Sequence, residues 1–257
     1  MNRINELFTK KNNHILSVYF TAGFPKFDDT VDILQTLQSH GVDLIEIGIP
    51  FSDPIADGPV IQQSNHIALQ NGMSIKKLFS QLEDVRNHIS IPLIMMGYLN
   101  PVLQFGFEKF CAECHRVGID GLIIPDLPMD DFINEYKGIS EKYGLKFIFL
   151  ITPETSAERI REIDNNTDGF IYMVSSAAVT GVRQSFDDLR LAYFNRINSM
   201  NLKNPRLVGF GISNKSTSDS ANMYSSGAII GSAFIKLLNE SSDIEEAVEK
   251  LLENLNK

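Results

Sequence analysis

The amino-acid sequence predicts an α/β protein folded as a single (β/α)8 barrel (TIM barrel) that spans residues 1–257. Short apolar runs alternate with amphipathic helical stretches along the whole chain, which is typical of parallel βαβ units. No proline- or serine-rich linker divides the chain, and its length matches the roughly 250 residues of such barrels. One barrel domain is therefore expected.

Eight apolar runs are predicted to be the strands. They cover residues 16–23, 43–50, 92–98, 121–126, 146–152, 169–175, 206–211 and 227–232. Helical stretches such as "DDTVDILQTLQSH" and "FEKFCAECHRV" separate them. A doubly wound open sheet is the rival fold, but it usually carries a G-x-G-x-x-G turn after the first strand, and "TAGFPKFDD" has none. The barrel is favoured.

Two intervals between predicted strands are unusually long. Most strand starts are 21 to 29 residues apart, whereas the interval after the second strand is 49 residues and that after the sixth is 37. Barrel active sites are formed by the loops that follow the strands. Extra elements with a functional role are therefore expected after strands 2 and 6.

Composition excludes several classes of protein. A net charge of −9 disfavours nonspecific binding to nucleic acid, which needs a basic surface. The first residues lack the apolar core of a secretory signal, and no apolar run is long enough to span a bilayer. We expect a cytoplasmic protein with no membrane contact.

The two cysteines, Cys111 and Cys114, lie in "CAECH", which formally matches a c-type haem attachment pattern. Both fall on an apolar helical stripe that runs from Phe107 to Val117. They are interpreted as small buried hydrophobic residues, and a haem or redox site is disfavoured.

Glu46 interrupts the apolar run of the second strand. Side chains alternate along a strand, so Leu44 and Glu46 share one face while Ile45 and Ile47 share the other. If the β-branched face packs against the outer helices, Glu46 points into the barrel near its catalytic end. Desolvation there raises the pKa of a carboxyl group, so that it can carry a proton near neutral pH. A buried glutamate satisfied by a hydrogen-bond donor is the structural alternative, and a functional role is favoured.

The loop after this strand, "PFSDPIADGP", contains two further acids. Prolines and a glycine restrict its backbone, which would hold Asp57 over the barrel mouth. Asp53 precedes a proline and is interpreted as a turn residue.

Glycine and serine follow the seventh and eighth strands, in "GFGIS" and "GSA". Loops at these two positions of a barrel commonly bind phosphate through backbone N–H groups and a helix N-terminus. Gly211, Gly231 and Ser232 are the candidates, and tight turns with a serine N-cap are the alternative. The segment "SSAAVTGVRQSF" after strand 6 is predicted to be a lid that delivers Thr180 and Gly181.

Residues missing from the strand ends narrow the chemistry. None of the five histidines falls at the carboxyl end of a predicted strand, which disfavours a catalytic metal. No lysine lies there to form a Schiff base. Carboxylate acid–base catalysis on a phosphorylated substrate is what remains.

Seven segments, found in order across nearly the whole chain, closely resemble the tryptophan synthase α-subunit family. They are "YFTAGFP", "IEIGIPFSDPIADGPVIQ", "GYLNPVLQFG", "GLIIPDLP", "VTG", "GFGIS" and "GSA". The resemblance implies retro-aldol cleavage of indole-3-glycerol phosphate to indole and glyceraldehyde 3-phosphate. The substrate's own indole ring is then the electron sink, so neither a metal nor an imine is required.

The resemblance also implies roles for individual residues. Glu46 would be the general acid and base, and Asp57 would accept a hydrogen bond from the indole N–H. Residues implied in substrate binding are Tyr172 beside Glu46, Thr180 against Asp57, Gly181, Gly211, Gly231 and Ser232 at the phosphate, and Tyr19, Met96, Ile123 and Phe210 around the indole. The family usually has a glycine where Ala178 precedes "VTG", a departure that affects the lid and not the chemistry.

A partner is implied as well. In the family two α chains flank a β dimer that holds pyridoxal phosphate and receives indole through a tunnel, an α2β2 heterotetramer. This chain would need no cofactor, and its contacts with the β subunit would come from residues 54–59 and "YLNPV". Two alternatives stay open: another phosphate-binding barrel enzyme, and a regulatory subunit with vestigial catalysis.

Overall fold

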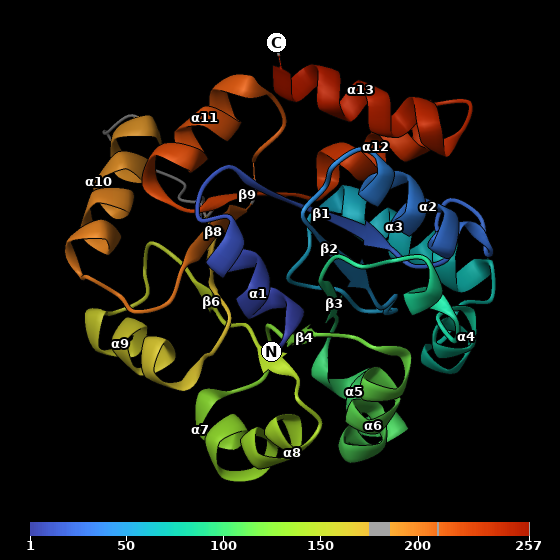
Figure 1. Ribbon diagram of the computed structural model, residues 1–257, viewed down its shortest axis with the longest axis horizontal. Helices are drawn as coiled ribbons and strands as arrows, with labels where there is room; N and C mark the ends of the chain where they lie inside the picture. The colour runs from blue at the N-terminus through green and yellow to red at the C-terminus, as the bar shows by residue number, and fades with distance from the viewer. Residues whose placement is uncertain (175–185, 210, 257) are drawn as a thin grey trace.

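The computed structural model describes residues 1–174, 186–209 and 211–256. Its strands are β1 Ile15–Thr21, β2 Leu44–Gly48, β3 Leu93–Met96, β4 Gly121–Ile123, β5 Lys146–Phe147, β6 Leu150–Ile151, β7 Ile171–Val174, β8 Arg206–Gly209 and β9 Gly227–Ile230. Its helices are α1 Arg3–Lys10, α2 Asp29–Ser39, α3 Pro59–Gln70, α4 Ile75–Gln81, η1 Val85–Asn87, α5 Leu99–Phe105, α6 Phe107–Val117, α7 Met129–Asp131, η2 Phe132–Tyr136, α8 Lys137–Lys142, α9 Ala157–Asn166, α10 Phe186–Ser199, α11 Lys215–Tyr224, α12 Ser232–Glu240 and α13 Ile244–Asn256. In Figure 1 the helices surround a central ring of strands.

All strand pairs are parallel, and the ring closes through the predicted fifth strand. This strand is divided into β5, which pairs with β4, and β6, which pairs with β7. Between them the Ile148 N–H donates to the Leu122 carbonyl (2.9 Å), and the Phe149 carbonyl accepts from the Tyr172 N–H (3.0 Å). One continuous segment therefore bonds to both neighbours, so the nine segments form the eight predicted strands. The α/β barrel is confirmed.

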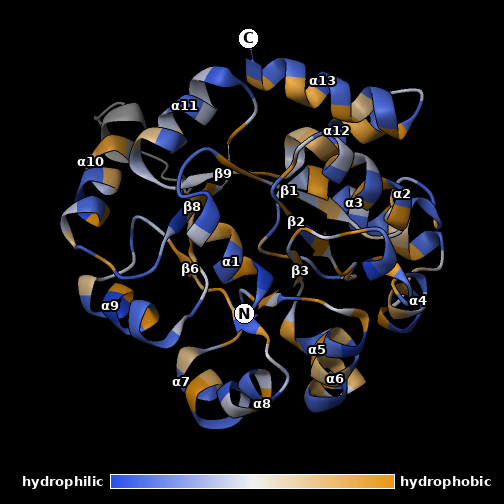
Figure 2. Ribbon diagram, in the orientation of Figure 1, coloured by the Kyte–Doolittle hydropathy of each residue, from blue (hydrophilic) through white to orange (hydrophobic). Residues whose placement is uncertain are grey.

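The apolar residues form two separate clusters, as expected for side chains that alternate along buried strands. One fills the barrel interior and includes Leu44, Ile94 and Ile229. The other lies between strands and outer helices and includes Ile45 and Ile47. In Figure 2 the strands are mostly apolar and the outer helices carry both polar and apolar residues. The predicted orientation of the second strand is confirmed.

Of the two predicted insertions, the one after β2 is described. The helices α3, α4 and η1 lie between β2 and β3, where a single helix would suffice for a βαβ unit. The predicted lid after β7, with Thr180, Gly181 and Ala178, falls in 175–185, outside the described residues. Cys111 and Cys114 are buried on α6 as predicted.

Helix α1 was not predicted and covers the amino end of the barrel (Figure 1). Its Ile4 is fully buried in the interior cluster, and the Asn2 side chain caps the helix and donates to the Asp120 and Gly144 carbonyls. Among the described residues, α1 therefore covers the amino end of the barrel interior, which leaves the opposite end as the place for a site. In the described part of the chain, no helix is both long and apolar enough to cross a membrane.

Candidate active site

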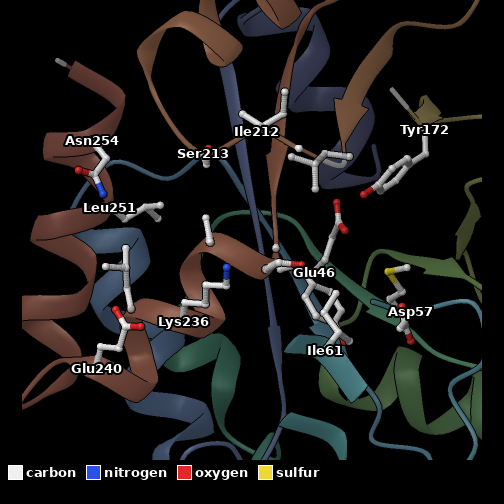
Figure 3. A pocket seen from close by; sticks show the side chains of 18 residues that line it. Glu46, Asp57, Ile61, Tyr172, Ile212, Ser213, Lys236, Glu240, Leu251 and Asn254 are labelled. Carbon is white, nitrogen blue, oxygen red and sulfur yellow. The ribbon is translucent and has the colours of Figure 1, made fainter. Parts of the chain in front are cut away.

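A cavity of about 370 Å³ opens at the carboxyl ends of the strands. In Figure 3 the strand residues Glu46 and Tyr172 lie at one end of it, and Lys236 of α12 lies at the other. Tyr19 and Ser232 also line this cavity. A second cavity of about 240 Å³ shares Tyr19, Asp57 and Met96 with the first. The strand ends thus form one elongated site, with Glu46 and Asp57 toward one end and α12, which carries Lys236 and Glu240, at the other.

Glu46 is fully buried on β2 and points into this cavity. The Ser17 hydroxyl donates to its Oε1 at 2.9 Å, while its Oε2 is buried without a hydrogen-bond partner among the described residues. Burial raises the pKa of Glu46 to about 8, and the hydrogen bond from Ser17 opposes this effect. A carboxyl group with such a pKa exists in both protonation states near neutral pH, as proton transfer in both directions requires.

Asp57 lies on the loop after β2, half-buried at the junction of the two cavities. The Tyr98 hydroxyl donates to its Oδ2 at 3.0 Å and accepts from the Ala56 N–H at 3.0 Å. The Gln62 amide donates to the Asp57 carbonyl at 2.9 Å. Burial raises the pKa of Asp57, and the Tyr98 hydrogen bond lowers it. Contacts with Tyr98, which follows β3, and with Gln62 on α3 therefore hold the loop so that this carboxyl group lies at the cavity.

Two tyrosine rings lean over glycines on neighbouring strands. A Cβ at Gly48 would lie 2.2 Å from the Tyr19 hydroxyl oxygen, and one at Gly209 would lie 2.2 Å from that of Tyr172. Burial raises the pKa of both tyrosines, so both hydroxyls are neutral at physiological pH. The glycines thus let two large rings lie flat inside the barrel mouth.

Gly48→Ala should therefore push the Tyr19 ring toward the ligand space. We expect a KM increase of about tenfold and a stability loss of about 1–3 kcal/mol, the usual cost of overpacking. Gly138→Ala on α8 is the matched control, because its added Cβ would meet no atom within 4 Å. Steady-state kinetics and thermal unfolding of both variants test this. Equal KM values in the two variants would contradict the packing role of Gly48.

The far end of the cavity offers unsatisfied backbone donors. Helix α12 begins at Ser232 after Gly231, and no side chain caps it. In contrast, Asn214 caps α11 through a capping box with Thr217. An uncapped helix N-terminus beside Gly211 can accept an anion. The alternative of a serine N-cap is not observed, since the N-cap positions are Gly231 and Asn214.

The structure brings most of the predicted site residues to one place. Tyr19, Glu46, Asp57, Met96, Tyr172, Gly211, Gly231 and Ser232 all line the larger cavity. Ile123 is fully buried in the barrel interior and lines neither cavity. Phe210, Thr180 and Gly181 lie outside the described residues.

Other lining residues were missed by the sequence analysis. Lys236 follows Ser232 by one helical turn on α12, a spacing that could have identified it. Leu251 and Asn254 reach the site from α13 through the packing of α13 on α12, and no local sequence pattern predicts that contact.

One group among the described residues has the arrangement of metal ligands, and it lies elsewhere. His40, Glu245 and Glu249 place their ligand atoms within 4.8 Å of one another on α13 and the C-cap of α2. The His40 Nε2 lies 3.3 Å from a Glu245 carboxylate oxygen, so this contact between α2 and α13 accounts for the cluster.

Comparison with known proteins decides the family. The family model described as the tryptophan synthase alpha chain matches residues 6–257. The chain belongs to the tryptophan synthase alpha chain family. Alpha chains from Parabacteroides distasonis and Flavobacterium johnsoniae are 60% and 58% identical to it, covering 99% and 98% of this chain and 99% and 100% of theirs.

Solved structures of alpha chains have the same fold. The tryptophan synthase alpha subunit of Legionella pneumophila superposes with a TM-score of 0.88 at 32% identity, covering 99% of this chain and 97% of that one. A mutant alpha subunit from Pyrococcus furiosus gives 0.85 at 34% identity, covering 96% and 99%. The predicted family and barrel are confirmed, and with them the lyase activity of tryptophan synthase alpha chains, cleavage of indole-3-glycerol phosphate.

Proposed function

We propose that Glu46 carries out both proton transfers of the cleavage, giving a proton to C3 of the indole and taking one from the hydroxyl group on the adjacent side-chain carbon. The supporting observation is a buried carboxyl group at the cavity with a pKa of about 8 and one oxygen without a protein partner. Protonation at C3 makes the ring an electron acceptor. The carbon–carbon bond then breaks, its electron pair returns to the ring, and the hydroxyl becomes the aldehyde of glyceraldehyde 3-phosphate.

In these reaction steps a single residue both gives and receives the proton. Glu46 loses a proton to C3 and regains one from the hydroxyl, so it ends in its starting state. A pKa of about 8 keeps both protonation states of Glu46 accessible near neutral pH, as its two roles require. No further acid or base is needed for the overall reaction.

Asp57 is proposed to bind the indole N–H and to stabilise the positive charge that protonation at C3 places on the ring. Its Oδ2 already accepts from Tyr98, which leaves Oδ1 for the substrate. A fixed carboxylate at this position stabilises charge that develops only during the reaction.

The phosphate is proposed to bind at the first turn of α12, near Gly211 and Gly231. The backbone N–H groups there lack a side-chain cap, and the helix dipole favours an anion. The Lys236 side chain lines the same end of the cavity and adds a positive charge (Figure 3). The indole is proposed to lie at the opposite end with Tyr19, Met96, Phe210 and Tyr172. Thr180 is proposed to meet Asp57 there, and Gly181 to bind the phosphate.

We also propose that the chain, one catalytic domain, works in the cytoplasm as part of an α2β2 heterotetramer, with pyridoxal phosphate in the β subunits and no cofactor of its own. Ile55 and Leu103 are exposed apolar side chains near the predicted partner contact, and Ile55 is 89% exposed. Tyr98 bonds to the loop that contains Ile55 and to Asp57, so docking of a partner there would also order the carboxyl group. Gel filtration with and without the β subunit tests the assembly.

The purified chain, incubated with indole-3-glycerol phosphate with and without a β subunit, tests the proposed chemistry. Release of free indole and glyceraldehyde 3-phosphate in equal amounts, without added metal or cofactor, is expected. No indole under either condition would overturn the proposal.

Asp57→Asn should keep the fold and lower kcat by about 10²-fold, as for other single groups that stabilise developing charge. The amide preserves the shape of the side chain but not its negative charge. Asp53→Asn is the matched control, because Asp53 lies on the same loop and lines neither cavity. Unchanged kcat in Asp57→Asn would return Asp57 to a purely structural role in the loop.

A further inference from the structure

Ser17 is a buried polar residue among the apolar side chains of the barrel interior. It is fully buried on β1, and its register partner Leu44 belongs to the interior cluster, as do Ile15 and Ile229. A hydroxyl group in such surroundings is costly unless it is hydrogen-bonded. Its hydrogen-bond partner among the described residues is Oε1 of Glu46 at 2.9 Å. The position of this hydroxyl is thus explained by the carboxyl group that it contacts.

The contact makes the two oxygens of Glu46 unequal. Oε1 accepts from Ser17, whereas Oε2 has no partner in the described part of the chain. If the proton of the neutral acid sat on Oε1, the serine hydroxyl would have to turn and accept it. The serine's own hydrogen would then be left without an acceptor among the described residues. The proton is therefore placed on Oε2.

The groups around Glu46 offer no other stabilisation of its charge. Tyr19 on β1 and Tyr172 on β7 are neutral, Asp57 has the same sign of charge, and Ile94 and Met96 on β3 are apolar. Within the described residues no lysine, arginine or histidine shifts the pKa of Glu46, and the Ser17 hydrogen bond is what lowers it against burial.

We propose that Ser17 is a positioning residue for the cleavage: its hydroxyl fixes Oε1 of Glu46 and leaves the transferable proton on Oε2, the oxygen available to the substrate. This inference rests on the proposed role of Glu46. Ser17 itself lines neither cavity, so it acts through Glu46 and not on the substrate.

Ser17→Ala and Ser17→Thr separate this role from simple packing. With alanine, we expect the protonation midpoint of Glu46 to rise by about one pH unit, since a hydrogen bond to a charged group is worth that much. We also expect kcat to fall about tenfold with KM nearly unchanged. Threonine keeps the hydroxyl and should restore both the midpoint and kcat.

The measurements are kcat and KM from indole release, and the midpoint from the carbon NMR signal of the Glu46 carboxyl group, assigned by its loss in Glu46→Gln. Ser64→Ala is the matched control. It removes a fully buried hydroxyl that contacts Thr21 at 2.7 Å and not Glu46. The protonation midpoint of Glu46 in this variant should therefore stay at the parent value.

The outcomes distinguish the inference from the function on which it rests. The role of Ser17 alone would be overturned if the parent is active, Glu46→Gln is inactive, and Ser17→Ala changes neither the Glu46 midpoint nor kcat. Full activity in Glu46→Gln would overturn the role of Glu46, and that of Ser17 with it.

Discussion

Glu46→Gln should lower kcat by at least about 10²-fold, the typical contribution of a general acid–base group, while KM changes little. The amide has nearly the same volume as the carboxyl group and can still accept the Ser17 hydrogen bond. It cannot exchange a proton with C3 or with the substrate hydroxyl. Steady-state indole release measures the effect, and turnover equal to that of the parent would show that another group moves the protons.

The same substitution should stabilise the fold at higher pH. The pKa of Glu46 rises from an ordinary 4.5 to about 8 on folding, so the folded chain holds this proton more tightly than the unfolded chain. Above pH 4.5 ionisation therefore favours unfolding, and this penalty grows until about pH 8 and is then constant. Glutamine has no such penalty. Urea unfolding at pH 5 and pH 8 should show a stability advantage of the variant that increases with pH, of the order of a few kcal/mol.

Asp120→Ala should give the largest loss of stability, about 3–5 kcal/mol, because it breaks a buried ion-pair network. Asp120 is 3% exposed at the amino end of the barrel. It accepts from Arg3 (2.9 Å), Arg86 (2.5 Å) and the Leu93 N–H (2.9 Å). Without this carboxylate the largely buried Arg86 guanidinium loses its ion-pair partner. The free energy of unfolding in urea measures the effect.

Glu113→Ala is the control for that experiment. Glu113 pairs with Arg116 at 2.8 Å on the exposed face of α6, where an ion pair contributes less than about 1 kcal/mol. Because Asp120 lies at the end of the barrel opposite the cavity, kcat of the folded Asp120→Ala variant should stay near the parent value. A stability loss no larger than that of Glu113→Ala would contradict the structural role of Asp120.

The strand pattern of the sequence was sufficient to predict the barrel and the inward orientation of Glu46. Alternation is a local property of one strand, so a single charged residue in an apolar run has only two possible faces. Asp57 was predictable for a similar reason, since prolines restrict the loop that contains it.

Contacts between distant segments were not predictable. Ser17 and Glu46 are 29 residues apart, and Tyr98 and Asp57 are 41 apart. Both contacts depend on how neighbouring strands are staggered around the barrel, which composition and periodicity do not specify. The split of the fifth strand has the same origin, because its two halves bond to different neighbours.

Helix α1 is a different case, because its signal is present in the sequence. Asn2 is a good N-cap residue, and Ile4, Leu7 and Phe8 form a short apolar stripe at helical spacing. Eight residues are marginal for an isolated helix, and the barrel interior stabilises this one by burying Ile4. The apolar stripe is too short to predict this helix from the sequence alone.

The protonation midpoint of Glu46 in the intact chain, followed by carbon NMR of its carboxyl group from pH 4 to pH 10, tests the proposed chemistry most directly. A midpoint near 8 is expected, because burial without a positively charged partner raises the pKa to about that value. A midpoint near 4.5 would mean that Glu46 is ionised throughout the neutral range and cannot donate the proton that the cleavage requires.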